Sequence, residues 1–202
     1  MDTYLGYDVF SMLLGPTEQN QITNKLKVIG DIQNYRETVV HKETDSRLSF
    51  TTYQANFAER SSLRTFFKGK KGKLLPFWYL SPVHIGTIIE DVSAGVSFRM
   101  EETGLRRKDQ TQAMFIYIPD VQIYTQVLSV TSDDHEDLGR YEDIVTTYDF
   151  ITSPLSVGTK VYSILFGRFD QDTLTFDFID NNVSTASITF KELQADLQHL
   201  IS

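Results

Sequence analysis

The chain contains no cysteine, and this single absence excludes several kinds of site. Without thiols there are no disulfides, no thiolate nucleophile, no iron–sulfur cluster and no cysteine-ligated zinc. Stability must therefore come from packing or from assembly. The four histidines, His41, His84, His135 and His199, are scattered, and none has the close spacing of a metal-binding pair. We expect neither a metal nor a cofactor.

Long apolar runs and an excess of positive charge are missing as well. No stretch approaches the roughly 18 apolar residues that cross a bilayer, and residues 1–10 have neither a basic nor an apolar leader region. The net charge of −8 disfavours nucleic acid and anionic lipid as partners, because both require clustered Lys and Arg. We expect no nucleic-acid and no membrane partner, and a protein made and assembled in a cytoplasm.

The chain does have enough apolar surface to build a core. Apolar residues make up 41% of the 202 residues, with fourteen Phe, ten Tyr and a single Trp. This composition is typical of a folded chain and not of a disordered one. No repeat, low-complexity tract or Pro/Gly-rich linker divides the sequence, so we predict one domain over residues 1–202.

The dominant hydrophobic period is two, which predicts β-strands with one apolar face. Leu48 and Phe50 alternate with polar residues, as do Leu174, Phe176 and Phe178, and we expect both rows to face a core. Asp180-Asn181-Asn182 predicts a hairpin loop between the last two strands. The expected strands cover residues 26–32, 37–41, 47–54, 75–80, 86–92, 96–100, 113–118, 121–131, 143–149, 160–166, 173–179 and 183–190.

One helix is predicted from Phe57 to Lys68, because Asn56 can cap it and Glu59 completes a capping box. Its apolar face consists of Leu63, Phe66 and Phe67. A short C-terminal helix is predicted over residues 191–200. The predicted fold is mainly β, a β-rich α+β domain: an antiparallel β-sandwich or barrel with one packed helix and a short C-terminal helix.

The only dense basic cluster is Lys68, Lys70, Lys71 and Lys73, interrupted by glycines. A phosphate-binding loop leaves a strand and enters a helix, whereas this segment leaves the predicted helix and enters a strand. The pattern favours a solvated loop whose lysines suit the helix C-terminus. The alternative is an exposed basic loop that contacts an acidic partner subunit.

The segment after this loop holds the only Trp, between Phe77 and Tyr79. A central core strand is one interpretation. Because Trp and Tyr are enriched at subunit interfaces, Phe77, Trp78 and Tyr79 are also candidate interface residues. Alternate residues of a strand face opposite sides, so the two interpretations are compatible.

The acidic clusters match no catalytic or metal-binding motif. Residues 133–137 hold four carboxylates but lack the ligand spacing and the glycine of a calcium-binding loop, so a mobile acidic loop is the better interpretation. Asp170 and Asp172 are typical of a turn. There is no Gly-x-Ser-x-Gly motif for a serine nucleophile. The sequence therefore predicts no catalytic residues.

Several segments together resemble tail proteins of long-tailed bacteriophages. In that family a helix rich in charge and Phe leads through a basic Gly loop into a Pro-Phe-Trp strand, as residues 63–73 and 75–79 do here. The later segments 127–130, 149–154, 158–162, 165–169 and 188–193 follow the family order. Position 163 is Ser where relatives often have Pro, and residues 1–34 match nothing in the family and are candidates for an extended arm.

The resemblance implies a virion tail component, assembled in the host cytoplasm, that forms a homo-oligomeric ring, suspected to be a hexamer. Its partners would be tail-tube, hub or fibre proteins. The implied role is a distal-tail or tail-tip ring that joins the tube to the baseplate or fibres. Two alternatives stay open: a β-barrel module that binds carbohydrate or another ligand through exposed aromatics, and a glycosidase that uses two dispersed carboxylates.

Overall fold

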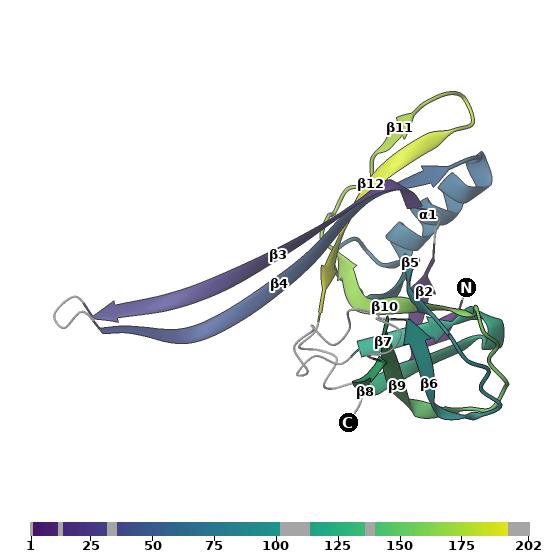
Figure 1. Ribbon diagram of the computed structural model, residues 1–202. Coiled ribbons are helices and arrows are strands. Elements are labelled where there is room, and N and C mark those ends of the chain that lie inside the picture. The colour runs from purple at the N-terminus through teal and green to yellow at the C-terminus, as the bar shows by residue number, and fades with distance from the viewer. Residues whose placement is uncertain (1, 12–13, 32–35, 102–113, 136–139, 194–202) are drawn as a thin grey trace. The chain divides into compact units, whose positions relative to one another are not determined.

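The computed structural model of the chain describes residues 2–11, 14–31, 36–101, 114–135 and 140–193, and it has a mainly β fold (Figure 1). Within these ranges the only α-helix is α1. The elements are β1 (Thr3–Tyr4), β2 (Tyr7–Phe10), β3 (Leu14–Asp31), β4 (Arg36–Gln54), α1 (Phe57–Gly69), β5 (Phe77–Thr87), β6 (Gly95–Glu101), β7 (Met114–Ile118), the 3₁₀ turn η2 (Pro119–Val121), β8 (Ile123–His135), β9 (Arg140–Ile151), β10 (Lys160–Phe169), β11 (Phe176–Phe178) and β12 (Ser184–Glu192). The prediction of a mainly β fold with one packed helix is confirmed.

The chain divides into two compact units, neither of which is a continuous stretch of sequence. Unit 1 comprises residues 1–12, 77–166 and 194–202, and unit 2 comprises residues 13–76 and 167–193. Strand β10 contributes its first residues to unit 1 and its last three to unit 2. One domain over residues 1–202 stays a prediction. The C-terminal helix predicted over 191–200 lies outside the described residues, except for 191 and 192, which belong to β12, and residue 193.

Unit 1 is a row of strands in the order β1-β2-β5-β10-β7-β8-β9-β6. Its pair β2–β5 is parallel, so the sheet is mixed. Ile88, directly after β5, forms a bridge with Met100 of β6, and the amide of Ile89 donates to the carbonyl of Arg99 at 3.1 Å. Strand β6, at the end of the row, therefore meets the segment that follows β5, the third strand, so the strands from β5 to β6 close and unit 1 is barrel-like.

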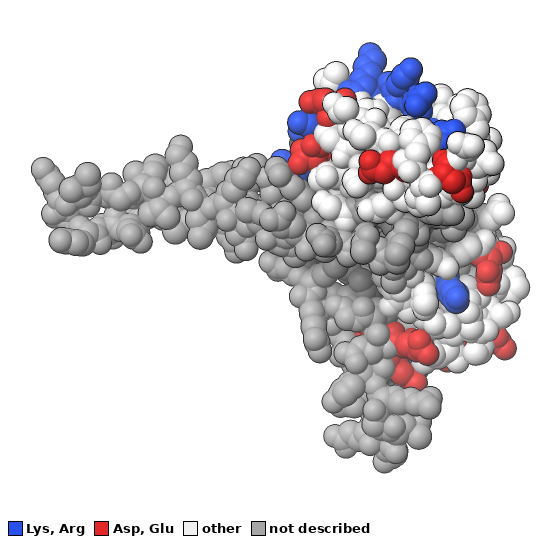
Figure 2. Space-filling view, turned by 90° about the horizontal axis from the view of Figure 1, so that it is seen from above, with Lys and Arg blue, Asp and Glu red and all other residues white. Residues whose placement is uncertain are grey.

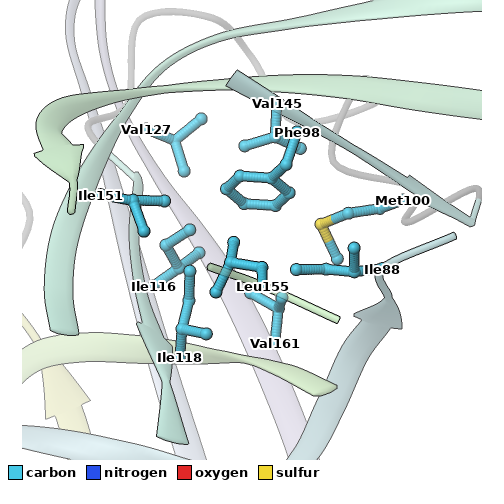
Figure 3. Packing of buried hydrophobic residues seen from close by; sticks show 10 residues of the cluster. All are labelled: Ile88, Phe98, Met100, Ile116, Ile118, Val127, Val145, Ile151, Leu155 and Val161. Atoms are coloured by element: carbon cyan, nitrogen blue, oxygen red, sulfur yellow. The ribbon is translucent and has the colours of Figure 1, made fainter. Parts of the chain in front are cut away.

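The interior of unit 1 is filled with aliphatic and aromatic side chains. Figure 3 shows ten of them pointing toward one another, each at most 5% exposed. They come from strands spread along the row, because Phe98 and Met100 lie on β6, at its end, while Val161 lies on β10, in its middle. Burying such side chains is the main favourable term in folding. This cluster is the core of the unit.

Unit 2 is built on β4, which pairs with β12 on one side and β3 on the other. Gln54 pairs with Ser184, and Thr52 with Ala186, so these residues share one buried face. The Gln54 amide donates to the Thr52 hydroxyl at 2.6 Å, and the Ser184 hydroxyl donates to the Gln54 oxygen at 3.2 Å. These buried polar side chains find their hydrogen-bond partners in one register of β12 against β4, so they specify how the two strands align.

Strand β4 is longer than the sequence predicted. Residues 37–41 and 47–54 were expected as two strands, but they form one strand of 19 residues that pairs with the 18 residues of β3. The intervening residues 42–46 are mostly charged and carry no apolar row to signal a strand. Backbone pairing with β3 keeps them extended.

The hairpin of β11 and β12 has the loop that the sequence predicted. Phe178 pairs with Ser184, and the Asp180 carboxylate accepts hydrogen bonds from the amides of Asn182 at 2.7 Å and Val183 at 2.8 Å. These two amides hold the pKa of the Asp180 carboxyl below its usual range. An Asp at the start of a turn does this because its side chain reaches its own backbone two residues on.

Helix α1 begins at the predicted cap. The Asn56 side-chain oxygen accepts from the Glu59 amide at 3.0 Å. The Glu59 carboxylate reaches back to the Asn56 side-chain amide and to the backbone amide of Ala55, at 3.0 and 2.8 Å. The capping box is therefore confirmed. Its second backbone hydrogen bond, to the Glu59 carboxylate, comes from the amide of Ala55, one residue before the cap.

Replacing Asn56 with Ala is expected to lower the free energy of unfolding by about 1 kcal/mol, because one amide at the helix start loses its acceptor. Denaturant titration followed by far-UV circular dichroism measures the change. Asn56→Asp is the matched control, since it keeps an acceptor at the cap and should stay within about 0.5 kcal/mol of the wild type. Equal stability of the Ala and Asp variants would contradict the role of the cap.

Candidate interaction surface

Helix α1 presents two different faces within unit 2. Leu63, Phe66 and Phe67 are buried as predicted, and the rings of Phe66 and Phe67 lie 6.0 and 4.8 Å from the ring of Phe169 on β10. The opposite face carries Arg64 and Lys68, which are both exposed. The 3.6-residue period that buries one face therefore leaves a basic face outward.

Two arginines of α1 lie over phenylalanine rings of unit 2. The guanidinium carbon of Arg60 lies 5.4 Å from the centre of the Phe57 ring and 4.8 Å from that of Phe178. Arg64 lies 5.5 Å from the centre of the Phe176 ring. A cation within about 6 Å of an aromatic face is attracted by the ring quadrupole. These contacts tie α1 to the β11–β12 hairpin.

The aromatic side chains around Arg60 are exposed, although Arg60 itself is only 9% exposed. Phe57 is 69% exposed, Phe178 is 62% exposed, and the neighbouring Ile179 is 65% exposed. The prediction that Phe178 faces a core is wrong. The rings of Phe176 and Phe178 contact arginines of α1 and not an apolar layer. Phe178 therefore remains largely exposed to solvent.

The basic loop that follows α1 is only partly exposed. Lys68, Lys71 and Lys73 are exposed, and the Lys73 ammonium lies 3.4 Å from the Asp172 carboxylate. Lys70 is 8% exposed, with its ammonium nitrogen 5.4 Å from the centre of the Phe66 ring. The expectation that Lys70 is exposed is therefore wrong. Lys70 caps the C-terminus of the helix, and the amide of Leu75 donates to its carbonyl at 3.0 Å. Its side chain lies against Phe66 in the last turn.

The loop turns tightly against the segment after β10. Lys71 and Gly72 have φ values of 54° and 60°, a left-handed conformation that glycine adopts most easily. A Cβ atom at Gly72 would lie 3.1 Å from a carboxylate oxygen of Asp172, which shows how closely the two segments approach. The loop leads from a helix into β5, which is not the order of a phosphate-binding loop.

Phe77, Trp78 and Tyr79 lie in unit 1 and are completely buried, at 0% exposure. The Trp78 indole donates to the Tyr4 carbonyl at 2.9 Å, and its ring lies 5.0 Å from the Phe166 ring. The core interpretation of this segment is the one that burial supports. Side chains without exposed surface cannot contact another subunit in this conformation, so these three are not part of the candidate surface.

Unit 1 also contains a tyrosine cluster with altered titration. The rings of Tyr117 and Tyr124 stack at 4.3 Å, and the Tyr124 hydroxyl donates to the Asp2 carboxylate at 3.2 Å. Burial, and then the negative charges of Asp149 and Asp2, raise the pKa of the Tyr4 and Tyr124 phenols. The phenols stay neutral in the physiological range, so this cluster supplies no phenolate base.

The remaining predicted sites acquire no catalytic or metal-binding geometry in the described residues. In the segment that connects β10 to β11, the amide of Asp170 donates to the Thr189 carbonyl at 2.7 Å and Asp172 pairs with Lys73. The exposed His84 lies beside Tyr162, with 6.3 Å between ring centres. Residues 133–135 of the predicted acidic loop belong to strand β8, which pairs with β9 there, so that part of the prediction is wrong. Residues 136 and 137, and the side chains of His41, His135 and His199, lie outside the described part. Among described residues there is no group of three metal-ligating side chains, and no helix long and apolar enough to span a membrane.

The candidate surface thus consists of Phe57, Arg60, Arg64, Lys68, Phe178 and Ile179, and we call it the α1 surface. Figure 2 shows Lys and Arg side chains gathered along the upper edge of the view. The sequence pointed to Lys68 but missed the aromatic members. The sequence feature that could have indicated these aromatic residues is the pair Arg60 and Arg64, spaced one turn apart on the predicted helix.

No protein-family model matches the chain, and no curated protein is significantly similar to it in sequence.

Proposed function

We propose that this chain is a structural component of the tail tip of a long-tailed bacteriophage, a distal-tail or tail-tip ring that joins the tail tube to the baseplate or fibres. In this role it assembles in the host cytoplasm into a homo-oligomeric ring, contacts tube, hub or fibre proteins, and carries out no reaction. The proposal rests on the resemblance of residues 57–193 to such proteins and on one structural observation, the pairing of β3 with β4.

The two-stranded ribbon of β3 and β4 carries the proposal. Strand β12 pairs with β4 from Arg47 to Gln54 only, so residues 36–46 of β4 pair with β3 alone among the described strands. At about 3.3 Å per residue this unsupported ribbon is roughly 35 Å long. A two-stranded ribbon is marginally stable by itself, and its unpaired edges invite pairing with another chain. Contact with a neighbouring subunit is the simplest source of the missing stabilisation.

Assembly is tested on the full purified chain by light scattering coupled to size exclusion, followed by negative-stain imaging. We expect a closed particle of several copies with a central opening, because a head-to-tail interface closes into a ring when its rotation allows. A chain that stays monomeric at the highest attainable concentration would contradict the proposal.

Removing the unsupported ribbon is expected to abolish assembly. Gln21 pairs with Arg47, so an Asn-Gly turn can replace residues 22–46 and close a short hairpin at that pair. We expect the dissociation constant for self-association to rise at least about a hundredfold, because the neighbouring subunit loses all of its contacts with the ribbon. Trp78 lies in unit 1, so its fluorescence serves as the control for folding. A folded variant that assembles like the wild type would exclude the ribbon from the interface.

A second candidate function is a module that binds carbohydrate or another ligand. Tyr148 and Phe150, two residues apart on β9, are 68% and 60% exposed, which suits an aromatic platform. The filled interior shown in Figure 3 means that such a ligand would bind outside the barrel-like unit. A monomer that binds a glycan, and loses that binding on Tyr148→Ala, would favour this function over the structural one.

A further inference from the structure

The two units differ strongly in charge. Unit 1 contains 16 Asp and Glu against 6 Lys and Arg, a net charge of −10, whereas unit 2 contains 11 against 13, a net charge of +2. In unit 1 the carboxylates of Glu90, Asp91, Glu101, Asp120 and Asp149 are exposed. Of the Lys and Arg side chains whose burial is described in unit 1, Lys160 is exposed and Arg99 is partly buried. Unit 1 is therefore strongly acidic, and we call its exposed carboxylates the acidic surface, whereas unit 2 has a small excess of positive charge.

The α1 surface of unit 2 has the composition of a protein-binding surface. Phe57, Phe178 and Ile179 together expose several hundred square ångströms of apolar area, a patch size that often marks an interaction site on a monomer. Aromatic residues and Arg are the types enriched at interface hot spots. Arg60, nine-tenths buried between two of these rings, has a buried nitrogen, Nη1, without a hydrogen-bond partner. The apolar centre and the rim of Arg64 and Lys68 suit a carboxylate-rich protein surface.

We propose that the α1 surface is the docking surface for a second copy of this chain, which it contacts through the acidic surface of that copy's unit 1. This inference rests on the proposed function, because it assumes self-assembly and names a second surface that takes part in it beside the β3–β4 ribbon. A head-to-tail interface needs two different, complementary surfaces on one chain. Opposite charges provide that complementarity and exclude the wrong pairing of two acidic surfaces. An unrelated acidic partner protein is the competing occupant.

Self-association is measured by sedimentation velocity over a range of concentrations, at about 0.1 M and about 1 M salt, where the Debye length falls from about 10 Å to about 3 Å. The wild-type chain is expected to associate more weakly at high salt. Lys68→Glu is expected to raise the dissociation constant roughly fivefold at low salt, because it reverses a charge on the rim of the interface. Phe57→Ser should raise it at least roughly tenfold by removing an anchor ring.

Lys160→Glu is the matched control. It changes the formal net charge by the same two units as Lys68→Glu, from −8 to −10, but it lies on the acidic unit. We expect it to leave association unchanged or to strengthen it. Equal weakening by both substitutions would mean that net-charge repulsion alone acts, and would overturn the inference.

The outcomes separate the inference from the function on which it rests. Assembly that persists unchanged in Lys68→Glu and Phe57→Ser, with both variants folded by circular dichroism, would overturn the α1 surface as the self-association site and leave the ring function standing. A wild-type chain that is strictly monomeric would overturn both. Binding of the monomer to a different acidic protein, lost in Lys68→Glu, would also overturn the assignment to a second copy.

Discussion

Replacing Gly167 with Ala is expected to lower the free energy of unfolding by about 3 kcal/mol or more. Gly167 pairs with Glu192, and a Cβ atom placed on it would overlap the Lys191 carbonyl oxygen and the Phe190 ring. The Phe190 ring is completely buried, so it has no room to move aside. The carbonyl belongs to the backbone of β12 and can shift only if the strand pairing shifts. A single methyl group therefore displaces β10 from β12.

The matched control is the same substitution in helix α1. A Cβ atom on Gly69 meets nothing within 4 Å, and Ala is the better helix former, so Gly69→Ala should be neutral or should stabilise by up to about 1 kcal/mol. Denaturant titration followed by circular dichroism measures both variants. A Gly167→Ala variant within about 0.5 kcal/mol of the wild type would show that β12 can withdraw at little cost, against the packing described for unit 2.

Replacing Phe98 with Ala is expected to cost about 3 to 5 kcal/mol, because it removes a large ring from the centre of the unit 1 core. Phe98 is 2% exposed and lies among the ten side chains of Figure 3, including Met100 and Leu155. The surrounding side chains belong to several strands and cannot all move inward, so a cavity remains. Folded domains have only about 5 to 15 kcal/mol of stability, so this loss is a large share of it.

Trp78 provides a direct readout of this variant, because it is the only Trp of the chain and is fully buried in unit 1. Its fluorescence should report the midpoint of denaturation shifting to lower denaturant concentration. Phe150→Ala is the matched control on β9, since Phe150 is 60% exposed and its loss should cost less than about 1 kcal/mol. Similar midpoints for the two variants would be inconsistent with the buried position of Phe98.

The elements that sequence reasoning predicted best depend on residues close together in the chain. The cap of α1 joins Asn56 to Glu59, three residues later, and the turn of the last hairpin joins Asp180 to Val183. Such contacts are encoded in a short window, so composition and spacing are enough to predict them. The buried strand at Phe77 was likewise indicated by its apolar run.

The candidate surface was predictable only in part. Lysines after the helix suggested a basic loop, but the burial of Lys70 depends on the position of the Phe66 ring. The Phe178 ring lies against Arg60, which is far away in sequence but only 4.8 Å from the ring centre in the fold. Alternation along a strand shows that two faces differ, but it does not show what each face meets. The assignment of Phe178 to a core failed for this reason.

By itself, the sequence determined that the chain is rich in β-strands, that one capped helix follows Asn56, and that chemistry based on thiols is excluded. Only the tertiary structure decided the order of the strands, the bridge by which Met100 of β6 meets Ile88 after β5, and the aromatic side chains that stay exposed. The physical reason is the range of the contacts. Thr52 donates to the carbonyl of Ala186, a residue 134 positions away, and no local pattern specifies such a partner before the chain has folded.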